Sequence, residues 1–349
     1  MNPSNWTFAG IILAALLFIF RPGCNVTNSG AFTNRDYSPL NPNFDRSGNY
    51  PNNRQYGPNG SNGSNGYVNQ ASHPGELSPS SVIIGAFNIQ SFGPTKASRP
   101  HVMEKLVDIV RRYDLLAIQE YRNEDQTVIE RFVEQINADG SQYGYIVGLR
   151  EGHTSHKEQY AYLFDMAKFE LTSQPYSIND PQGTMHRPPL VASFRCKQAP
   201  ENHGFTFTLL NVHVDPDIVE QELSALHAFM PAIFEQHAGE DDFLILGDFN
   251  TTERGIQNVR LVQNQLPLIR ESWATKVRSQ RSIDNIVIDG MRTSEYPNQS
   301  GVLNVMQQYQ LNAESALQIS DHFPVWAVFS TVEQEDRMVR GDQSFAQSR

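Results

Sequence analysis

The residues best suited to chemistry in this sequence are polar side chains that follow short apolar runs. The apolar run 243–246 leads directly into Gly247, Asp248, Phe249 and Asn250. A short apolar run bounded by glycine is typical of a buried strand. Asp248 and Asn250 are two residues apart, so in extended backbone their side chains leave the same face. A carboxylate and an amide presented together suit a hard cation or a phosphoryl oxygen, whereas an Asx turn ending the strand is the purely structural alternative.

Polar residues also follow or interrupt the other apolar runs. The runs 82–89, 114–120 and 282–288 are typical of buried strands, and 205–214 alternates in the manner of a half-buried strand. Each polar residue alone has an ordinary explanation, such as a satisfied buried amide or a solvated strand end. Purely structural roles are implausible for all of these residues at once. The set is Asn88, Glu120, Glu158, His213, Asp248, Asn250, Asp284, Asp321 and His322.

This set contains the groups that phosphodiester hydrolysis requires. Carboxylates and amides hold a divalent cation, which neutralises the phosphate. One imidazole paired with a carboxylate activates water, and a second imidazole protonates the leaving oxygen. Amide donors stabilise the charge of the transition state. The residue types therefore predict a metal-dependent hydrolase of phosphate esters.

The elements that must position these residues mix strands and helices without strict alternation. Helical spacing of apolar residues is present at 100–113, 127–136 and 218–234, and the runs 143–176 and 190–214 read as hairpins. This pattern favours an α/β (α+β) fold, a layered sandwich of two mixed β-sheets flanked by helices, over a barrel of βα units.

The chain divides by composition into four parts. Residues 1–24 contain the uncharged apolar run 6–20, which predicts a signal segment or a short membrane anchor. Residues 25–80 are rich in Asn, Ser, Gly and Pro and predict a disordered linker or a glycosylated stalk. The catalytic domain is expected at 81–331, and a polar tail at 332–349. We therefore expect a membrane-anchored or exported protein whose orientation the sequence leaves open.

Composition narrows the class of protein. The 349 residues carry a formal net charge of -11, which gives no bulk attraction to nucleic acid and counts against a pure nucleic-acid-binding module. It counts less against an enzyme whose acidic site is filled by cations. The two cysteines, Cys24 and Cys196, predict no disulfide within the folded part. The locally basic segment 254–281 is either a solvated loop or a surface that guides a polyanion.

Several short motifs together resemble the endonuclease/exonuclease/phosphatase superfamily, most closely its deoxyribonuclease I branch. The similarity covers roughly 81–331, in order and with plausible spacing. The motifs are Ala86-Phe87-Asn88-Ile89, Gln119-Glu120, Gly247-Asp248-Phe249-Asn250, Ile283-Asp284 and Ser320-Asp321-His322. The resemblance implies a four-layered α/β sandwich and magnesium-dependent hydrolysis of DNA, with Mn²⁺ or Ca²⁺ as substituting or assisting ions.

The resemblance also implies roles for the individual residues. It implies that Glu120 binds the metal with Asn88 and Asp321 close by, and that Asp248 and Asn250 bind metal and phosphate. The implied acid–base pair is His213 and His322, oriented by Glu158 and Asp284 respectively. Arg122 matches an arginine that reaches into the DNA minor groove, and Arg187 matches an arginine that contacts phosphate.

The sequence departs from the family pattern in three ways. A tyrosine that stacks in the minor groove is replaced by His156, which stacks more weakly. The disulfides of the secreted animal enzyme are absent. The segment after Asn250 is shorter and more basic than in the family, so the family's calcium site in that segment cannot be assigned to this chain. The expected substrate is duplex DNA, with single strands or RNA as alternatives. No protein partner can be inferred.

Two other functions remain open from the sequence. A phosphodiesterase or phosphatase of the same superfamily could act on lipid or inositol phosphates, which a membrane anchor would suit. A non-catalytic binding protein could use the same scaffold, although the intact set of His213, His322, Asp248 and Asp284 argues against it.

Overall fold

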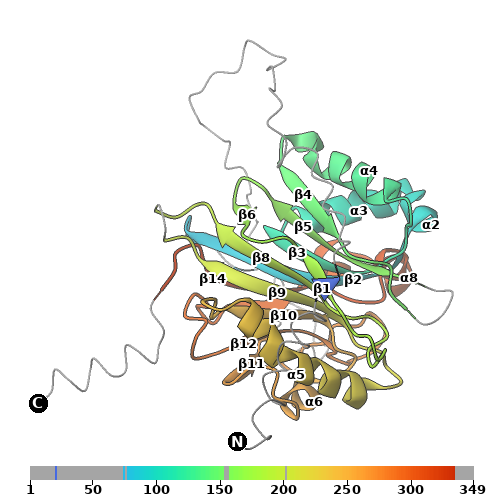
Figure 1. Cartoon of the computed structure of the whole chain (residues 1–349). Coiled ribbons are helices and arrows are strands. Elements are labelled where there is room, and N and C mark those ends of the chain that lie inside the picture. Colours follow the sequence, from blue (N-terminus) through green and yellow to red (C-terminus); the bar gives the residue numbers. More distant parts are fainter. Residues whose placement is uncertain (1–19, 22–73, 75–76, 153–156, 201–202, 335–349) are drawn as a thin grey trace, which may run out of the picture.

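Two β-sheets packed face to face form the centre of the molecule (Figure 1). The computed structural model describes residues 20–21, 74, 77–152, 157–200 and 203–334. Helices cover the outer face of each sheet, so the layers run helix, sheet, sheet, helix. The predicted four-layered sandwich of two mixed sheets is thereby confirmed.

The first sheet has six strands and contains the only parallel pair on its side of the sandwich, β2 with β3, within the described residues. The strand order is β13 (Ser300–Val302), β14 (Val325–Ser330), β2 (Ser81–Phe92), β3 (Leu115–Tyr121), β5 (Gln159–Asp165) and β4 (Tyr143–Val147). Because β2 and β3 are parallel, their carboxyl ends meet at one edge of the sheet, where Asn88 pairs with Gln119.

The second sheet has eight strands and contains the parallel pair β9 and β10. The order is β1 (Phe20–Arg21), β7 (Tyr176–Ile178), β8 (Leu190–Cys196), β9 (Thr206–His213), β10 (Phe243–Asp248), β12 (Asp284–Asp289) and β11 (Gln265–Pro267), with β6 (Phe169–Leu171) also paired to β8. The carboxyl ends of β9 and β10 again meet at one edge, where Asp248 lies in register with His213.

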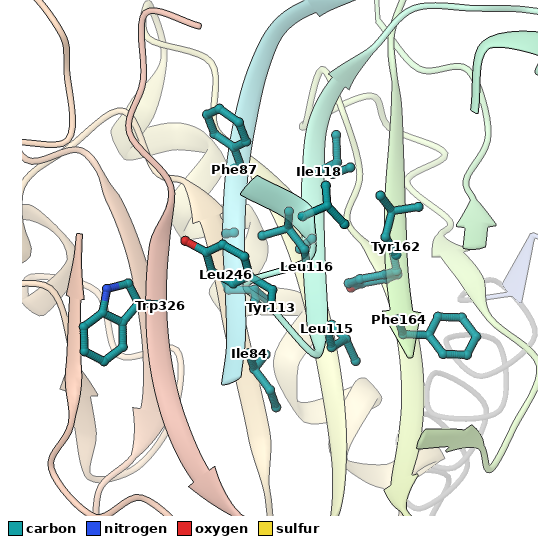
Figure 2. Close-up of a cluster of buried hydrophobic side chains, with 14 of the residues drawn as sticks. Ile84, Phe87, Tyr113, Leu115, Leu116, Ile118, Tyr162, Phe164, Leu246 and Trp326 are labelled. Atoms are coloured by element: carbon teal, nitrogen blue, oxygen red, sulfur yellow. The ribbon is translucent and has the colours of Figure 1, made fainter. Parts of the chain in front are cut away.

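Alternating residues of β10 show how the layers are held together. Leu244 and Leu246 belong to the core between the two sheets. Phe243 and Ile245 belong to a second core under the helix α5 (Val219–Gln236). A strand buried on both faces carries an almost continuous apolar run, as the sequence predicted. Figure 2 shows Leu246 among the β2 and β3 side chains of the core between the sheets.

The remaining helices are short and lie mostly over the six-stranded sheet or at the ends of the sandwich. Helices α3 and α4 contact each other, and α4 packs on β4. The bounds are α2 (Pro94–Ala97), α3 (Pro100–Val110), α4 (Thr127–Ile136), the 3-10 helix η2 (Asn137–Asp139), α6 (Glu253–Gln257), α7 (Val305–Gln308) and α8 (Ala313–Ile319).

The structure adds detail in segments whose residues show no clear periodic pattern. The segment 254–281 contains most of the short helix α6 and the short strand β11. The elements β13, α7 and α8 occupy a region for which no element was predicted. No helix in the described part of the chain is both long and apolar enough to cross a membrane. The predicted anchor, 6–20, lies outside the described residues apart from Phe20, and so do most of the linker and the tail.

Candidate active site

The predicted site residues come together because three adjacent strands place them side by side. Asp248 ends β10, where it pairs with His213 of parallel β9 on one side and with Asp284 of antiparallel β12 on the other. All three are almost fully buried, with exposures of 1%, 7% and 2%. The sheet thus fixes one carboxylate between an imidazole and a second carboxylate.

His213 is held by a carboxylate from the opposite sheet. Its Nδ1 lies 2.5 Å from Oε1 of Glu158, which precedes β5. Its backbone N–H donates to the hydroxyl of Tyr160 at 2.9 Å. The ring therefore directs Nε2 toward Asp248, whose Oδ2 lies 3.7 Å away. An imidazole fixed through Nδ1 presents the other nitrogen for proton transfer.

His322 forms a second pair of the same kind. Its Nδ1 lies 2.9 Å from Oδ2 of Asp284. The hydroxyl of Thr275 accepts the backbone N–H of Asp284 at 3.3 Å and so helps to fix the backbone that carries this carboxylate. Nε2 of His322 lies 3.5 Å from Oδ2 of Asp248. The two imidazoles therefore face the same oxygen of Asp248.

In each pair the opposite charge of the partner offsets part of the cost of burying an ionised group. Burial opposes protonation of the two imidazoles, but Glu158 raises the pKa of His213, and Asp284 together with Asp248 raises the pKa of His322 to about 9. Burial likewise opposes ionisation of Glu158, but His213 and Arg187 lower its pKa. Burial raises the pKa of Asp284, although His322 opposes the rise.

Glu120 and Asn88 lie beside the two imidazole–carboxylate pairs, and the side-chain amide of Asn88 links Glu120 to Asp248. Nδ2 of Asn88 donates to Oε1 of Glu120 at 3.2 Å and to Oδ2 of Asp248 at 3.1 Å. Oε2 of Glu120 accepts the backbone N–H of Ser91 at 2.8 Å. The backbone is strained here, because Glu120 and Ser91 have φ values of 61° and 54°. Non-glycine residues in this conformation cluster at functional sites.

Asn250 corrects one expectation from the sequence. The backbone after Asp248 is not extended, since β10 ends there and Asn250 has a φ of 50°. Oδ1 of Asp248 accepts the N–H of Asn250 at 2.9 Å, which is an Asx turn. The amide of Asn250 donates to the carbonyl of Val214 at 2.7 Å. The turn, and not strand alternation, brings Asn250 beside the site.

The two predicted arginines lie against two carboxylates of the predicted site, Glu120 and Glu158. Arg122 donates to Glu120 at 2.8 Å and lies 3.4 Å from Glu158. Nε of Arg187 lies 3.1 Å from Glu158 and donates to the carbonyl of His213 at 3.1 Å. His156 lies outside the described residues.

Asp321 is next to the site, but its direct partner is a lysine. Oδ2 of Asp321 forms a very short ion pair with Lys276, and its other oxygen is 3.8 Å from Nε2 of His322. Nζ of Lys276 also lies 2.8 Å from Nε2 of His322. Sequence reasoning noted Lys276 only as part of a basic segment.

Lys96 is a second functional candidate that the sequence analysis missed. Its buried ammonium donates to the carbonyls of Ile89 and Ile319, at 2.7 and 2.6 Å. Burial lowers the pKa of Lys96 to about 8, against the raising effect of Glu120 and Asp321. The Lys96 ammonium thus joins β2, which carries Asn88, to the end of α8, which leads into Asp321 and His322. In the sequence, only the position of Lys96 between Pro94 and the helix α3 hinted at a fixed conformation.

The donor set fits a divalent cation. One ligand atom from each of Asp248, Asp284 and His322 lies within 4.8 Å of the others. Glu120 adds a carboxylate that Asn88 bridges to Asp248. Several buried carboxylates close together are unfavourable unless a positive charge lies nearby. Carboxylate and amide oxygens are the ligands that hard cations prefer.

The comparisons with known proteins agree with this geometry. The sequence model of the Endonuclease/Exonuclease/phosphatase family matches residues 85–322, so the chain belongs to this family, whose members require a divalent metal ion. Mouse deoxyribonuclease-1-like 2 is 31% identical over 270 residues, which cover 74% of this chain and 95% of the relative. Rat deoxyribonuclease gamma is 29% identical, over 70% of this chain and 83% of the relative. The predicted similarity to deoxyribonuclease I is confirmed.

Solved structures confirm the fold. An endonuclease/exonuclease/phosphatase family protein of Bacteroides thetaiotaomicron superposes with a TM-score of 0.52 and 14% identity, covering 74% of this chain and all of the other. The catalytic domain of human Nocturnin, solved with bound sulfate, superposes with a TM-score of 0.51 and 12% identity, over 72% and 94% of the two chains.

Proposed function

We propose that this protein is a metal-dependent endonuclease that hydrolyses DNA with little sequence preference. The observation that carries the proposal is that two imidazole–carboxylate pairs, His213–Glu158 and His322–Asp284, face Oδ2 of one carboxylate, Asp248. Relatives named as deoxyribonucleases, at about the same identity over most of the chain, support DNA as the substrate.

The residues divide the proton transfers between them. Hydrolysis needs one group to take a proton from water and another to give a proton to the leaving oxygen. In this proposal each of the two imidazoles performs one of these proton transfers, through the Nε2 atom that faces Asp248. Glu158 and Asp284 hold the opposite nitrogens, so each ring keeps its orientation while its charge changes.

A divalent cation, which we propose to be Mg²⁺, completes the site. Glu120 would hold it, with Asn88 and Asp321 close by and Asp248 and Asn250 toward the phosphate. When bound, the cation neutralises negative charge on the phosphate. Mn²⁺ or Ca²⁺ would substitute or assist, because the same hard oxygen donors accept them.

Contact with DNA is assigned to the arginines at the rim. The side chain of Arg122 is 31% exposed, so the guanidinium can contact substrate while it remains bound to Glu120. Arg187 is more buried and lies beside His213, where it would meet a phosphate. We assign a stacking contact to His156, in place of a tyrosine, which suits looser binding to duplex DNA.

Nicking of supercoiled plasmid by the full chain tests this function. We expect nicking with Mg²⁺, none with chelator, and a loss of about 10²–10⁴-fold in His213→Ala, as for removal of a general acid or base. His203→Ala is the matched control, because His203 is exposed and precedes β9, whose opposite end carries His213. A folded protein that hydrolyses a phosphoinositide or a simple phosphodiester, but not DNA, would contradict the proposal.

We further propose that residues 6–20 anchor the enzyme in a membrane or direct its export. The uncharged apolar run and the polar segment that follows it support this. Cell fractionation of the full chain and of a chain lacking residues 1–24 tests the proposal. Identical soluble distribution of the two chains inside the cell would contradict it.

A further inference from the structure

A second group of carboxylates lies at the end of the sandwich opposite the active site. Asp242 immediately precedes β10, and Asp248 ends it, so about 20 Å of extended strand separates the two. Glu295 lies between β12 and β13, and Glu333 follows β14. One oxygen from each of Asp242, Glu295 and Glu333 lies within 4.8 Å of the others.

Oxygen atoms in this group are buried without hydrogen bonds. Asp242 and Glu295 are each 1% exposed, and Thr293 is fully buried. Among the described residues, Oδ1 of Asp242, Oε2 of Glu295 and Oγ1 of Thr293 have no hydrogen-bond partner. The Thr293 hydroxyl is nevertheless close enough to Asp242 to lower its pKa. Buried polar atoms are nearly always satisfied, so three orphaned oxygens in one place indicate a missing ligand.

The charge of the group points to the nature of that ligand. No ion pair in the described part of the chain involves Asp242 or Glu295. Burying several carboxylates is unfavourable unless a cation or protons neutralise them.

We propose that Asp242, Glu295 and Glu333 bind a divalent cation of the calcium type, with the hydroxyl of Thr293 as a further ligand. All the donor atoms are oxygens, which suits Ca²⁺ and its variable coordination. The group contains no histidine or cysteine, so it does not suit zinc. The site is separate from the catalytic residues, and the proposal does not depend on the proposed function.

The position of the group indicates what the cation would do. Oε2 of Glu333 accepts the backbone N–H of Thr206, the first residue of β9, at 2.9 Å. Oε1 of Glu295 accepts the N–H of Gln334 at 2.5 Å. A cation here would join the start of β10, the loop after β12 and the segment after β14. It would therefore link the two sheets and stabilise the fold.

Equilibrium dialysis of the full chain against Ca²⁺ tests the proposal. The wild type is compared with Glu295→Gln and with Glu314→Gln, a matched change at an exposed residue of α8. We expect Glu295→Gln to bind one Ca²⁺ fewer per chain than the other two proteins. We also expect Ca²⁺ to raise the unfolding temperature less in this variant. Equal stoichiometry in all three proteins, as expected if the carboxyl groups share protons instead, would overturn the proposal.

A measurement on the wild type keeps the test valid if the variant does not fold. Crystals of the full chain soaked in Tb³⁺, which replaces Ca²⁺, should show an anomalous peak among Asp242, Glu295 and Glu333. This peak is distinct from any ion at the catalytic carboxylates, about 20 Å away. Its absence at a concentration that fills the catalytic site would also overturn the proposal.

Discussion

Nζ of Lys276 lies 2.8 Å from Nε2 of His322, the nitrogen that also faces Asp248. The lysine therefore occupies the side of the imidazole that proton transfer would use. Its positive charge opposes protonation of the ring, whereas Asp284 and Asp248 favour it. The charge state of His322 is thus a balance between one lysine and two carboxylates.

Removing the lysine shifts this balance. In Lys276→Ala we expect the pKa of His322 to rise above its value of about 9, because a neighbouring positive charge is lost. Titration of the His322 ring by NMR, in the presence of chelator, measures the change. Arg278→Ala is the matched control, since it removes one positive charge from an exposed position of the same segment. An unchanged or lower pKa in Lys276→Ala would show that the contact does not govern the ring.

Removing the carboxylate partner has the opposite effect. In Asp284→Asn the pKa of His322 should fall, because Asp284 is the largest cause that raises it. One limb of the pH–rate profile should then move to lower pH, and kcat should fall by up to the roughly 10²–10⁴-fold that a general acid or base supplies. Movement of the alkaline limb would identify His322 as the acid, and movement of the acidic limb as the base. Neither limb would move if His322 took no part, as expected for the exposed control Asp217→Asn.

Much of the site could be predicted because the ends of buried strands are marked in the sequence by a change from apolar to polar residues. Asp248 and His213 end the apolar runs of two parallel strands, and Asp284 begins the run of a strand antiparallel to β10, so all three lie at one edge. The apolar run of β10 also predicted burial on both faces, which the two cores around Leu244 and Phe243 bear out.

What could not be predicted depends on contacts between loops. Lys276 reaches His322 through an isolated bridge between two irregular segments, and no periodicity marks either side of it. Asn250 approaches the site through an Asx turn, since β10 ends two residues earlier. The short elements between Ser300 and Ile319 are specified by packing and by asparagine caps. Each is too short for its apolar residues to show a helical or strand period, so the sequence did not predict them.

The buried pair of His213 and Glu158 should make stability depend on pH. Glu158 has a lowered pKa, so its contribution is present above the ordinary value of 4.5 and is lost as pH falls through the folded value. His213 has a raised pKa, so its contribution is complete below 6.5 and is lost as pH rises through the folded value. The pair therefore stabilises the fold most between these limits.

Comparison of Glu158→Gln with the wild type measures this contribution. With chelator present, we expect the free energy of unfolding to fall by roughly 3–5 kcal/mol near pH 5.5, because one partner of a buried charge pair is lost. The deficit should be smaller at pH 9.5 and at pH 3. Denaturant titrations at the three pH values give the differences. A deficit independent of pH would show that the pair contributes through packing and not through charge.

Gly247 should be required both for stability and for the position of Asp248. It has a φ of 141°, and a Cβ atom there would lie 2.0 Å from the carbonyl oxygen of Val212 in the neighbouring strand. Gly239 provides the matched control, because its φ of 103° is also unfavourable for other residues, but a Cβ atom there meets nothing within 4 Å. Gly239→Ala should therefore cost only backbone strain, about 1–3 kcal/mol. Gly247→Ala should cost clearly more, because β9 and β10 must also separate, and it should reduce nicking in the fraction that still folds by displacing Asp248 from His213. Equal losses of unfolding free energy in the two variants would mean that backbone conformation alone accounts for the glycine.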